Sequence, residues 1–134
     1  MMYKKRCVGC KNTKATTEFY ASSATEDGFN RYCIQCCKVN RSLEGVRKRD
    51  KKSKISFRQR HRATQLGVEC DHSITLALVF KERMGVCAIC KDWVQPKHAS
   101  IDHTHPLSKG GTHTWDNVQL VHLICNLRKG AKTE

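Results

Sequence analysis

Residues 101–111 read IDHTHPLSKGG and place an aspartate and two histidines within four positions. Carboxylates and imidazoles bind divalent metal ions, and an imidazole also accepts a proton from water near neutral pH. Asp102, His103 and His105 are therefore candidates for a structural metal site or for a catalytic centre. The stretch by itself does not distinguish these alternatives, and the partners must come from the rest of the chain.

The chain has nine cysteines in 134 residues, which predicts disulfides or metal sites. The pairs Cys7/Cys10 and Cys33/Cys36 both have CxxC spacing, so together they can form a tetrahedral four-thiolate zinc site. Cys37 is an alternative to Cys36, but Cys36 keeps the spacing. The basic N-terminus lacks the apolar run of a secretory signal, so we expect a cytoplasmic protein whose reduced thiols favour zinc.

The formal net charge of +13 is concentrated in the middle of the chain. Residues 38–66 hold 11 Lys and Arg against two Asp and Glu, whereas the segments on either side are nearly neutral. This distribution predicts a polyanionic partner, most simply DNA, and the alternative is a solvated linker. No apolar run is long enough to span a membrane. The predicted DNA contacts are Arg47, Lys48, Arg49, Lys51, Lys52, Arg58, Arg60, Lys109 and Lys129.

The expected elements divide the chain into three parts and give a small α+β fold. Residues 1–37 are expected to form a zinc-ribbon or knuckle module, and residues 38–66 a basic arm of one or two helices ending at Gly67. In residues 67–134 we expect a helix capped by Ser73, a strand over 99–102, a loop, a strand over 117–121 and a helix over 122–129. Apolar residues make up only 39% of the chain, so metal ions are expected to support the fold.

The residues of the third part resemble a known family. The matching text, in chain order, is Cys87-x-x-Cys90, IDHTHPLSKGG, WDNVQL at 115–120 and His122-x-x-Cys125-Asn126. Over residues 74–130 the chain resembles the HNH endonucleases, which have the ββα-metal fold. Many members have CxxC at the start of the helix, so the resemblance implies a zinc site of Cys87, Cys90, His122 and Cys125, in which histidine replaces a cysteine. The N-terminal module and basic arm resemble an arrangement found in some phage and bacterial members.

The resemblance also implies roles for four residues. His103 matches the general base, Asp102 the metal ligand before it, Asn117 the residue that orients the base across the loop, and Asn126 the metal ligand on the helix. Carboxylate and amide oxygens suit Mg²⁺ or Mn²⁺, whereas the thiolate sets suit two structural zinc ions. His105 is then expected to contact substrate or hydrogen-bond within the loop.

Three further residues have simpler interpretations. His98 and His113 are expected at the surface. The Gly110–Gly111 pair most simply allows a tight loop, and close approach of the backbone to DNA is the alternative.

The sequence therefore predicts a metal-dependent DNA endonuclease, and the resemblance implies 5′-phosphate and 3′-hydroxyl products. The main alternative is a non-catalytic, zinc-containing DNA-binding regulator. Restriction, intron mobility and phage DNA packaging use the same chemistry, and the sequence does not separate them. No pattern indicates a dimer interface, so the oligomeric state is left open.

Overall fold

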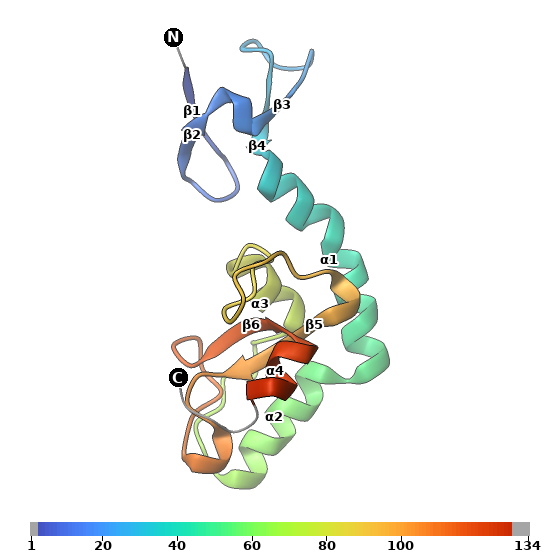
Figure 1. Ribbon diagram of the computed structural model, residues 1–134, viewed down its shortest axis with the longest axis vertical. Coiled ribbons are helices and arrows are strands. Elements are labelled where there is room, and N and C mark those ends of the chain that lie inside the picture. Colours follow the sequence, from blue (N-terminus) through green and yellow to red (C-terminus); the bar gives the residue numbers. More distant parts are fainter. Residues whose placement is uncertain (1–2, 130–134) are drawn as a thin grey trace. The chain divides into compact units, whose positions relative to one another are not determined.

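The computed structural model describes residues 3–129 (Figure 1). Residues 1, 2 and 130–134 lie outside the described part, and they belong to the first and last of the three segments predicted from the sequence. The chain divides into two compact units, and the division falls between Arg41 and Ser42. The division of the sequence into three segments stays a prediction. Within residues 3–129, no helix is both long enough and apolar enough to cross a membrane.

The first unit is built on two antiparallel hairpins. Strand β1 (Lys4–Arg6) pairs with β2 (Thr13–Ala15), and β3 (Phe19–Ala21) pairs with β4 (Phe29–Cys33). A 3₁₀ turn, η1 (Thr16–Glu18), joins the hairpins. The turn before β4 uses Gly28 at a φ of +78°, a conformation that favours glycine.

The basic segment forms two helices, α1 (Ile34–Ser53) and α2 (Ile55–Leu66). They are separate because Lys54 adopts a left-handed conformation with φ +53°, which interrupts α1. The side chain of Asp50 then accepts hydrogen bonds from both the backbone N–H and the hydroxyl of Ser56, and so caps the start of α2. At the other end, Gly67 ends α2 in a left-handed conformation, as its sequence position predicts.

The second unit continues with a short helix, two strands and a final helix. Its elements are α3 (Leu76–Glu82), η2 (Pro96–His98), β5 (Ala99–His103), η3 (Leu107–Lys109), β6 (Val118–His122) and α4 (Leu123–Lys129). The strand–loop–strand–helix order confirms the predicted small α+β fold. The predicted start of the first helix was wrong: Thr75 caps α3, because the N–H and hydroxyl of Ser73 are bound to Asp71 instead.

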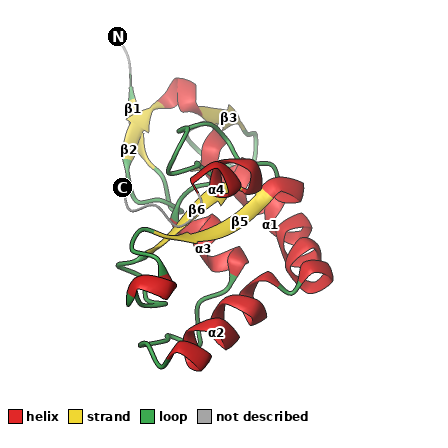
Figure 2. Cartoon of the chain, turned by 60° about the horizontal axis from the view of Figure 1, so that its bottom comes forward, coloured by secondary structure: helices red, strands yellow, loops and turns green. Residues whose placement is uncertain are grey.

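The β5–β6 hairpin is the centre of the second unit. Figures 1 and 2 both show it between α3 on one side and α4 on the other, and all five residues of β5 are buried. Ile101 and Leu120 form a cross-strand pair in its middle, and Ile74 and Phe80 are fully buried in the same unit. The hairpin therefore carries the candidate site residues on a strand that is covered from both sides.

The loop between β5 and β6 is closed by a very close backbone approach. A Cβ atom added to Gly111 would lie 1.9 Å from the carbonyl oxygen of His105, a distance that no side chain tolerates. The N–H of Gly111 donates to the carbonyl of Pro106 at 2.9 Å, which fixes this approach. This close approach of Gly111 is to the backbone of the loop itself, which agrees with the interpretation that the glycine pair allows a tight loop.

We expect Gly111→Ala to destabilise the second unit by about 2–3 kcal/mol or more, since the added methyl group must displace backbone. The measurement is urea unfolding of the zinc-loaded protein. Gly110→Ala is the matched control, because no atom lies within 4 Å of a Cβ added at Gly110. An alanine there is strained only by the backbone φ of +89°. Equal losses for the two variants would contradict the steric explanation.

Candidate active site and metal centres

A small cavity of about 170 Å³ collects the candidate catalytic residues. Strand β5 contributes Asp102 and His103, α4 contributes Asn126 and Lys129, and α2 contributes Arg62. Asn117 does not line it. The volume suits a phosphate group with its waters better than a whole nucleoside, because small-molecule pockets usually measure about 300–1,000 Å³.

Asp102 is buried and held by two partners. The Nζ of Lys129 lies 3.0 Å from its Oδ2, and Gln119, its cross-strand partner, donates from Nε2 to the same oxygen at 2.7 Å. Lys129 also donates to the backbone carbonyl of His103 at 3.0 Å. Lys129 is only 8% exposed. The structure thus places this predicted DNA contact inside the cavity, where its ammonium group neutralises the carboxylate.

The imidazole of His103 is paired with a second imidazole. Its Nε2 lies 2.9 Å from the Nδ1 of His113, which leaves Nδ1 of His103 as the nitrogen for a water molecule. Burial, followed by the neighbouring His113, lowers the pKa of His103 to about 4, although Asp102 acts in the opposite direction. The ring is therefore neutral near pH 7 and can accept a proton.

The burial of His113 corrects the sequence-based expectation that it lies at the surface. Its side chain is fully buried, and its N–H and carbonyl bond to Glu69 and Asp71 at 2.9 and 2.8 Å. Among the described residues, its Nε2 has no hydrogen-bond partner. No spacing rule connects positions 103 and 113, so the sequence holds no signal for this pair. His98 is exposed, as expected.

Asn117 braces the loop rather than the imidazole itself. Its Oδ1 accepts the N–H of His105 at 2.8 Å, and its Nδ2 donates to the carbonyls of His105 and Thr112 at 3.0 and 2.7 Å. These bonds join the two ends of the loop that carries His113. His105 is exposed and bonds through Nε2 to the carbonyl of Lys109 at 2.9 Å, which is a contact within the loop.

The oxygen donors of the cavity fit a hard divalent ion. Asp102 supplies a carboxylate and Asn126 an amide oxygen, and both line the same cavity. Among the described residues, the Asn126 side chain makes one long hydrogen bond, in which Nδ2 donates to the hydroxyl of Ser100 at 3.5 Å, and this bond leaves Oδ1 for another partner. Such a donor set suits Mg²⁺ or Mn²⁺ and is poor for zinc.

The four cysteines predicted for the first unit come together. The sulfur atoms of Cys7, Cys10, Cys33 and Cys36 all lie within 4.8 Å of one another, and Cys37 is outside the cluster. Burial alone would raise the pKa of Cys7, but N–H donors from Cys33 and Cys10 outweigh it and lower the pKa to about 6. Burial, followed by the nearby thiols, raises the pKa of Cys36. A dication relieves this crowding of thiolates, so the set fits zinc.

The second cluster consists of Cys87, Cys90, His122 and Cys125, whose ligand atoms also lie within 4.8 Å of one another. The Nε2 of His122 lies 3.0 Å from the carbonyl oxygen of Trp93 and donates to it. Nδ1 then keeps its lone pair and lies 3.3 Å from the sulfur of Cys90. This orientation is typical of a histidine that binds zinc, and the cluster ties the turn before β5 to the start of α4.

The predicted DNA contacts outside the cavity fall into three groups. Arg49 is engaged within the unit, where its Nε donates to the carbonyl of Ala99 at 2.6 Å. Three of them line a second cavity beside α2: Arg47, Lys51 and Arg60. The remaining side chains are exposed: Lys48, Lys52, Arg58 and Lys109.

Comparison with known proteins finds a similarity in the C-terminal part of the chain. Residues 87–132, about a third of the sequence, match the family model described as HNH endonuclease. No curated protein and no solved structure matches the chain. The match covers β5, β6, α4 and the second zinc-ligand set. Residues 87–132 are therefore similar to the HNH endonuclease family, and their strand–strand–helix order agrees with the ββα order that this resemblance implies.

Proposed function

We propose that the protein is a metal-dependent endonuclease that hydrolyses phosphodiester bonds of DNA. The observation that carries this proposal is the small cavity shared by Asp102, His103, Asn126 and Lys129 within the part that matches the HNH family. A neutral buried imidazole, two oxygen ligands and a fixed cation are the groups that phosphodiester hydrolysis needs.

In this proposal His103 is the general base. Its Nδ1 accepts a proton from a water molecule, and the oxygen of that water attacks the phosphorus while the 3′-oxygen leaves and takes up a proton from solvent water. The products are a 5′-phosphate and a 3′-hydroxyl. His113 accepts the hydrogen bond from Nε2–H, so that Nδ1 keeps its lone pair. Asn117 contributes indirectly, because it closes the loop that positions His113.

The remaining residues of the cavity serve binding and charge. Asp102 and Asn126 would hold Mg²⁺ or Mn²⁺, which supplies charge neutralisation at the phosphate when it is bound. Arg62 is exposed at the wall of the cavity and is suited to a non-bridging phosphate oxygen. Lys129 holds the Asp102 carboxylate and the backbone of His103 in place.

A second candidate function is a non-catalytic DNA-binding regulator that keeps the zinc-supported scaffold. The ion pair between Lys129 and Asp102 favours it, because the ammonium group already satisfies the carboxylate that a catalytic ion needs. This candidate predicts strongly salt-dependent DNA binding without cleavage. Plasmid nicking in Mg²⁺ or Mn²⁺ separates the two functions.

The pairing of His103 and His113 leads to a prediction about the tautomer. Asparagine at position 113 places an acceptor oxygen near the position of Nδ1, whereas leucine fills the space without an acceptor. We therefore expect His113→Leu to lower the cleavage rate about 10–100-fold, and His113→Asn to retain most of it, because a partner that orients a functional histidine has effects of that size.

The measurement is the single-turnover cleavage rate, with DNA affinity and melting temperature measured on the same samples. Equal rate losses for the asparagine and leucine variants, or losses that follow the melting temperature, would show that His113 has only a packing role.

A further inference from the structure

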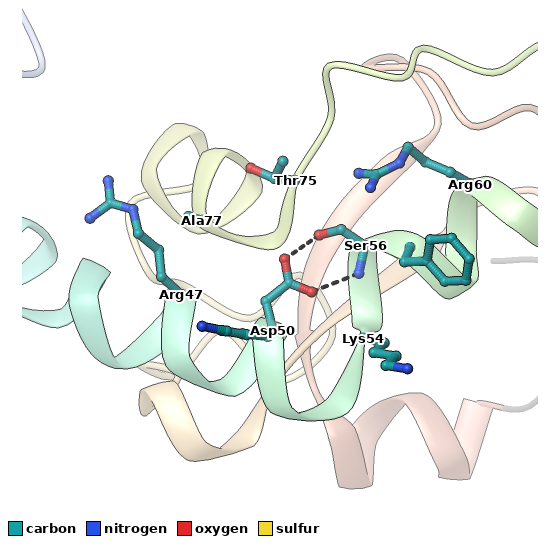
Figure 3. A pocket seen from close by; sticks show the side chains of 9 residues that line it. Arg47, Asp50, Lys54, Ser56, Arg60, Thr75 and Ala77 are labelled. Carbon is teal, nitrogen blue, oxygen red and sulfur yellow. Dashed lines mark hydrogen bonds between the residues drawn. The ribbon is translucent and has the colours of Figure 1, made fainter.

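A second cavity of about 430 Å³ lies where α1 gives way to α2, opposite the start of α3 (Figure 3). All of its lining residues belong to the second unit. Its volume is within the range of about 300–1,000 Å³ that small-molecule pockets occupy, and it is larger than the candidate active site. A nucleotide therefore fits here by size, whereas the active-site cavity suits a phosphate.

The charge of this cavity is strongly positive. Four cationic residues line it: Arg47, Lys51, Lys54 and Arg60. Its one carboxylate, Asp50, is already engaged in capping α2 through Ser56, as the dashed lines in Figure 3 show. The cations are thus available to an anionic ligand, and a phosphate group is the anion that such a cluster favours.

Hydrogen bonds hold two of the residues that line the cavity. Ser56 is buried, and its hydroxyl accepts the N–H of Leu76 at 2.8 Å, which joins α2 to the first residue of α3. Arg60 donates from one guanidinium nitrogen to the carbonyl of Ile74 at 3.3 Å, so its position is fixed while its other N–H groups remain for a ligand. Arg60 can therefore bind an anion without first ordering its own side chain.

An aromatic ring borders the same cavity. Phe57 is 57% exposed, and its ring stacks on that of His61 with the planes 7° apart and the centroids 5.7 Å apart. Exposed aromatic rings beside a cationic groove bind unpaired bases by stacking. A paired base has no free face, because its neighbours in the duplex cover both sides.

The two cavities lie on different sides of α2. Phe57 and Arg60 line this cavity, whereas Arg62 and Gln59 line the candidate active site. Helix geometry separates Phe57 from Arg62 by about 7.5 Å along the axis and by about 140° around it. A DNA strand that reaches both cavities must bend around α2. A few unpaired nucleotides bend in this way easily, whereas a stiff duplex does not.

We propose that this cavity binds an unpaired nucleotide of the DNA substrate, a few positions from the bond that is cut. Its phosphate lies among Lys51, Lys54 and Arg60, and its base stacks on Phe57. The inference rests on the proposed function, since it takes DNA as the substrate. It gives the protein a preference for DNA that is locally single-stranded near the cut over DNA that is fully paired.

The test is equilibrium binding, measured by fluorescence anisotropy, of the full zinc-loaded chain carrying His103→Ala. Two DNA probes of the same sequence are compared, one fully paired and one with a short unpaired stretch. We expect Phe57→Ala to weaken binding of the partly unpaired probe about five- to hundredfold and to change binding of the duplex less than about twofold. Leu66→Ala is the matched control, because Leu66 is another exposed apolar residue of α2 outside the cavity.

A separate variant tests whether the cationic residues of the cavity bind the phosphate. Lys51→Gln combined with Lys54→Gln is expected to weaken binding of both probes and to reduce the slope of log affinity against log salt by about 1.4–1.8. Lys97→Gln, an exposed lysine of η2, is expected to leave binding of the partly unpaired probe unchanged. Equal effects of Phe57→Ala on the two probes, or no effect on either, would overturn the proposal.

The outcome is independent of the proposed nuclease activity. If the wild-type chain does not cleave DNA but Phe57→Ala still weakens binding of the partly unpaired probe more than binding of the duplex, the nucleotide site stands and the nuclease proposal fails. If the wild-type chain cleaves DNA and Phe57→Ala affects binding of the two probes equally or not at all, the nuclease proposal stands and the nucleotide site fails. The melting temperature of each variant establishes that it is folded.

Discussion

Replacement of His103 by alanine is expected to lower the rate of DNA cleavage by about 10²–10⁴-fold, the usual contribution of a positioned general base. The imidazole is buried, is neutral near pH 7 and has its Nε2 held by His113, so its Nδ1 is the assigned proton acceptor. The variant is expected to bind DNA with nearly wild-type affinity, because the cationic residues of α1 and α2 are untouched. The measurement is plasmid nicking by purified protein in Mg²⁺ or Mn²⁺.

His98→Ala is the matched control, since His98 is an exposed histidine outside the cavity. It is expected to cleave at the wild-type rate. Equal cleavage by wild type and His103→Ala would contradict the assigned base and would point to a contaminating nuclease. Absence of cleavage by the wild type across a broad screen of divalent ions, with DNA binding intact, would favour the regulator.

Replacement of Cys87 by serine is expected to unfold the second unit and to reduce bound zinc from two ions per chain to one. Structural zinc stabilises small domains by about 10–16 kcal/mol, which equals or exceeds the whole net stability of about 5–15 kcal/mol of an ordinary domain. Loss of this ion is therefore expected to leave the second unit with little or no net stability. Zinc content by mass spectrometry and amide exchange in β5, β6 and α4 measure the two effects.

Three further variants make this result specific. Cys10→Ser is expected to lose the other zinc ion and to leave the protection of β5 and β6 unchanged, because each ligand set lies within one unit. Cys70→Ser is expected to keep both ions, since Cys70 belongs to neither set. His122→Cys restores four thiolates and should keep two ions. Two ions per chain in Cys87→Ser would show that this cluster is not a zinc site.

The ligand clusters and the strand order were predictable because each depends on local spacing. A CxxC pair turns two thiolates toward one ion wherever it occurs, and for Cys87 and Cys90 the family resemblance implied the second pair, His122 and Cys125. The soft ligands and the hard ligands Asp102 and Asn126 alternate along the sequence, and their different chemistry predicted two kinds of metal site. The structure brings each of these groups together in space.

The sequence did not predict the contacts that depend on tertiary packing. His113 looked like one more loop histidine because its burial depends on the 69–71 segment, which lies far away along the chain. Lys129 looked like a surface cation because the sequence does not show that α4 turns it toward Asp102. Ser73 and Thr75 are equally good capping residues by type, and the choice between them depended on the bond from Ser73 to Asp71.

The pairing of β5 with β6 gives the zinc cluster a further consequence. A slip of one residue in a two-stranded ladder turns every side chain to the opposite face, and here it would put Ile101 or His103 in the place of Asp102. All of β5 is buried, so the alternation of apolar and polar residues does little to prevent such a slip. His122 pairs with Ala99 at the end of the ladder and belongs to the zinc cluster. A zinc ion bound at this cluster would therefore fix the register of the hairpin, and with it the position of Asp102 in the proposed active site.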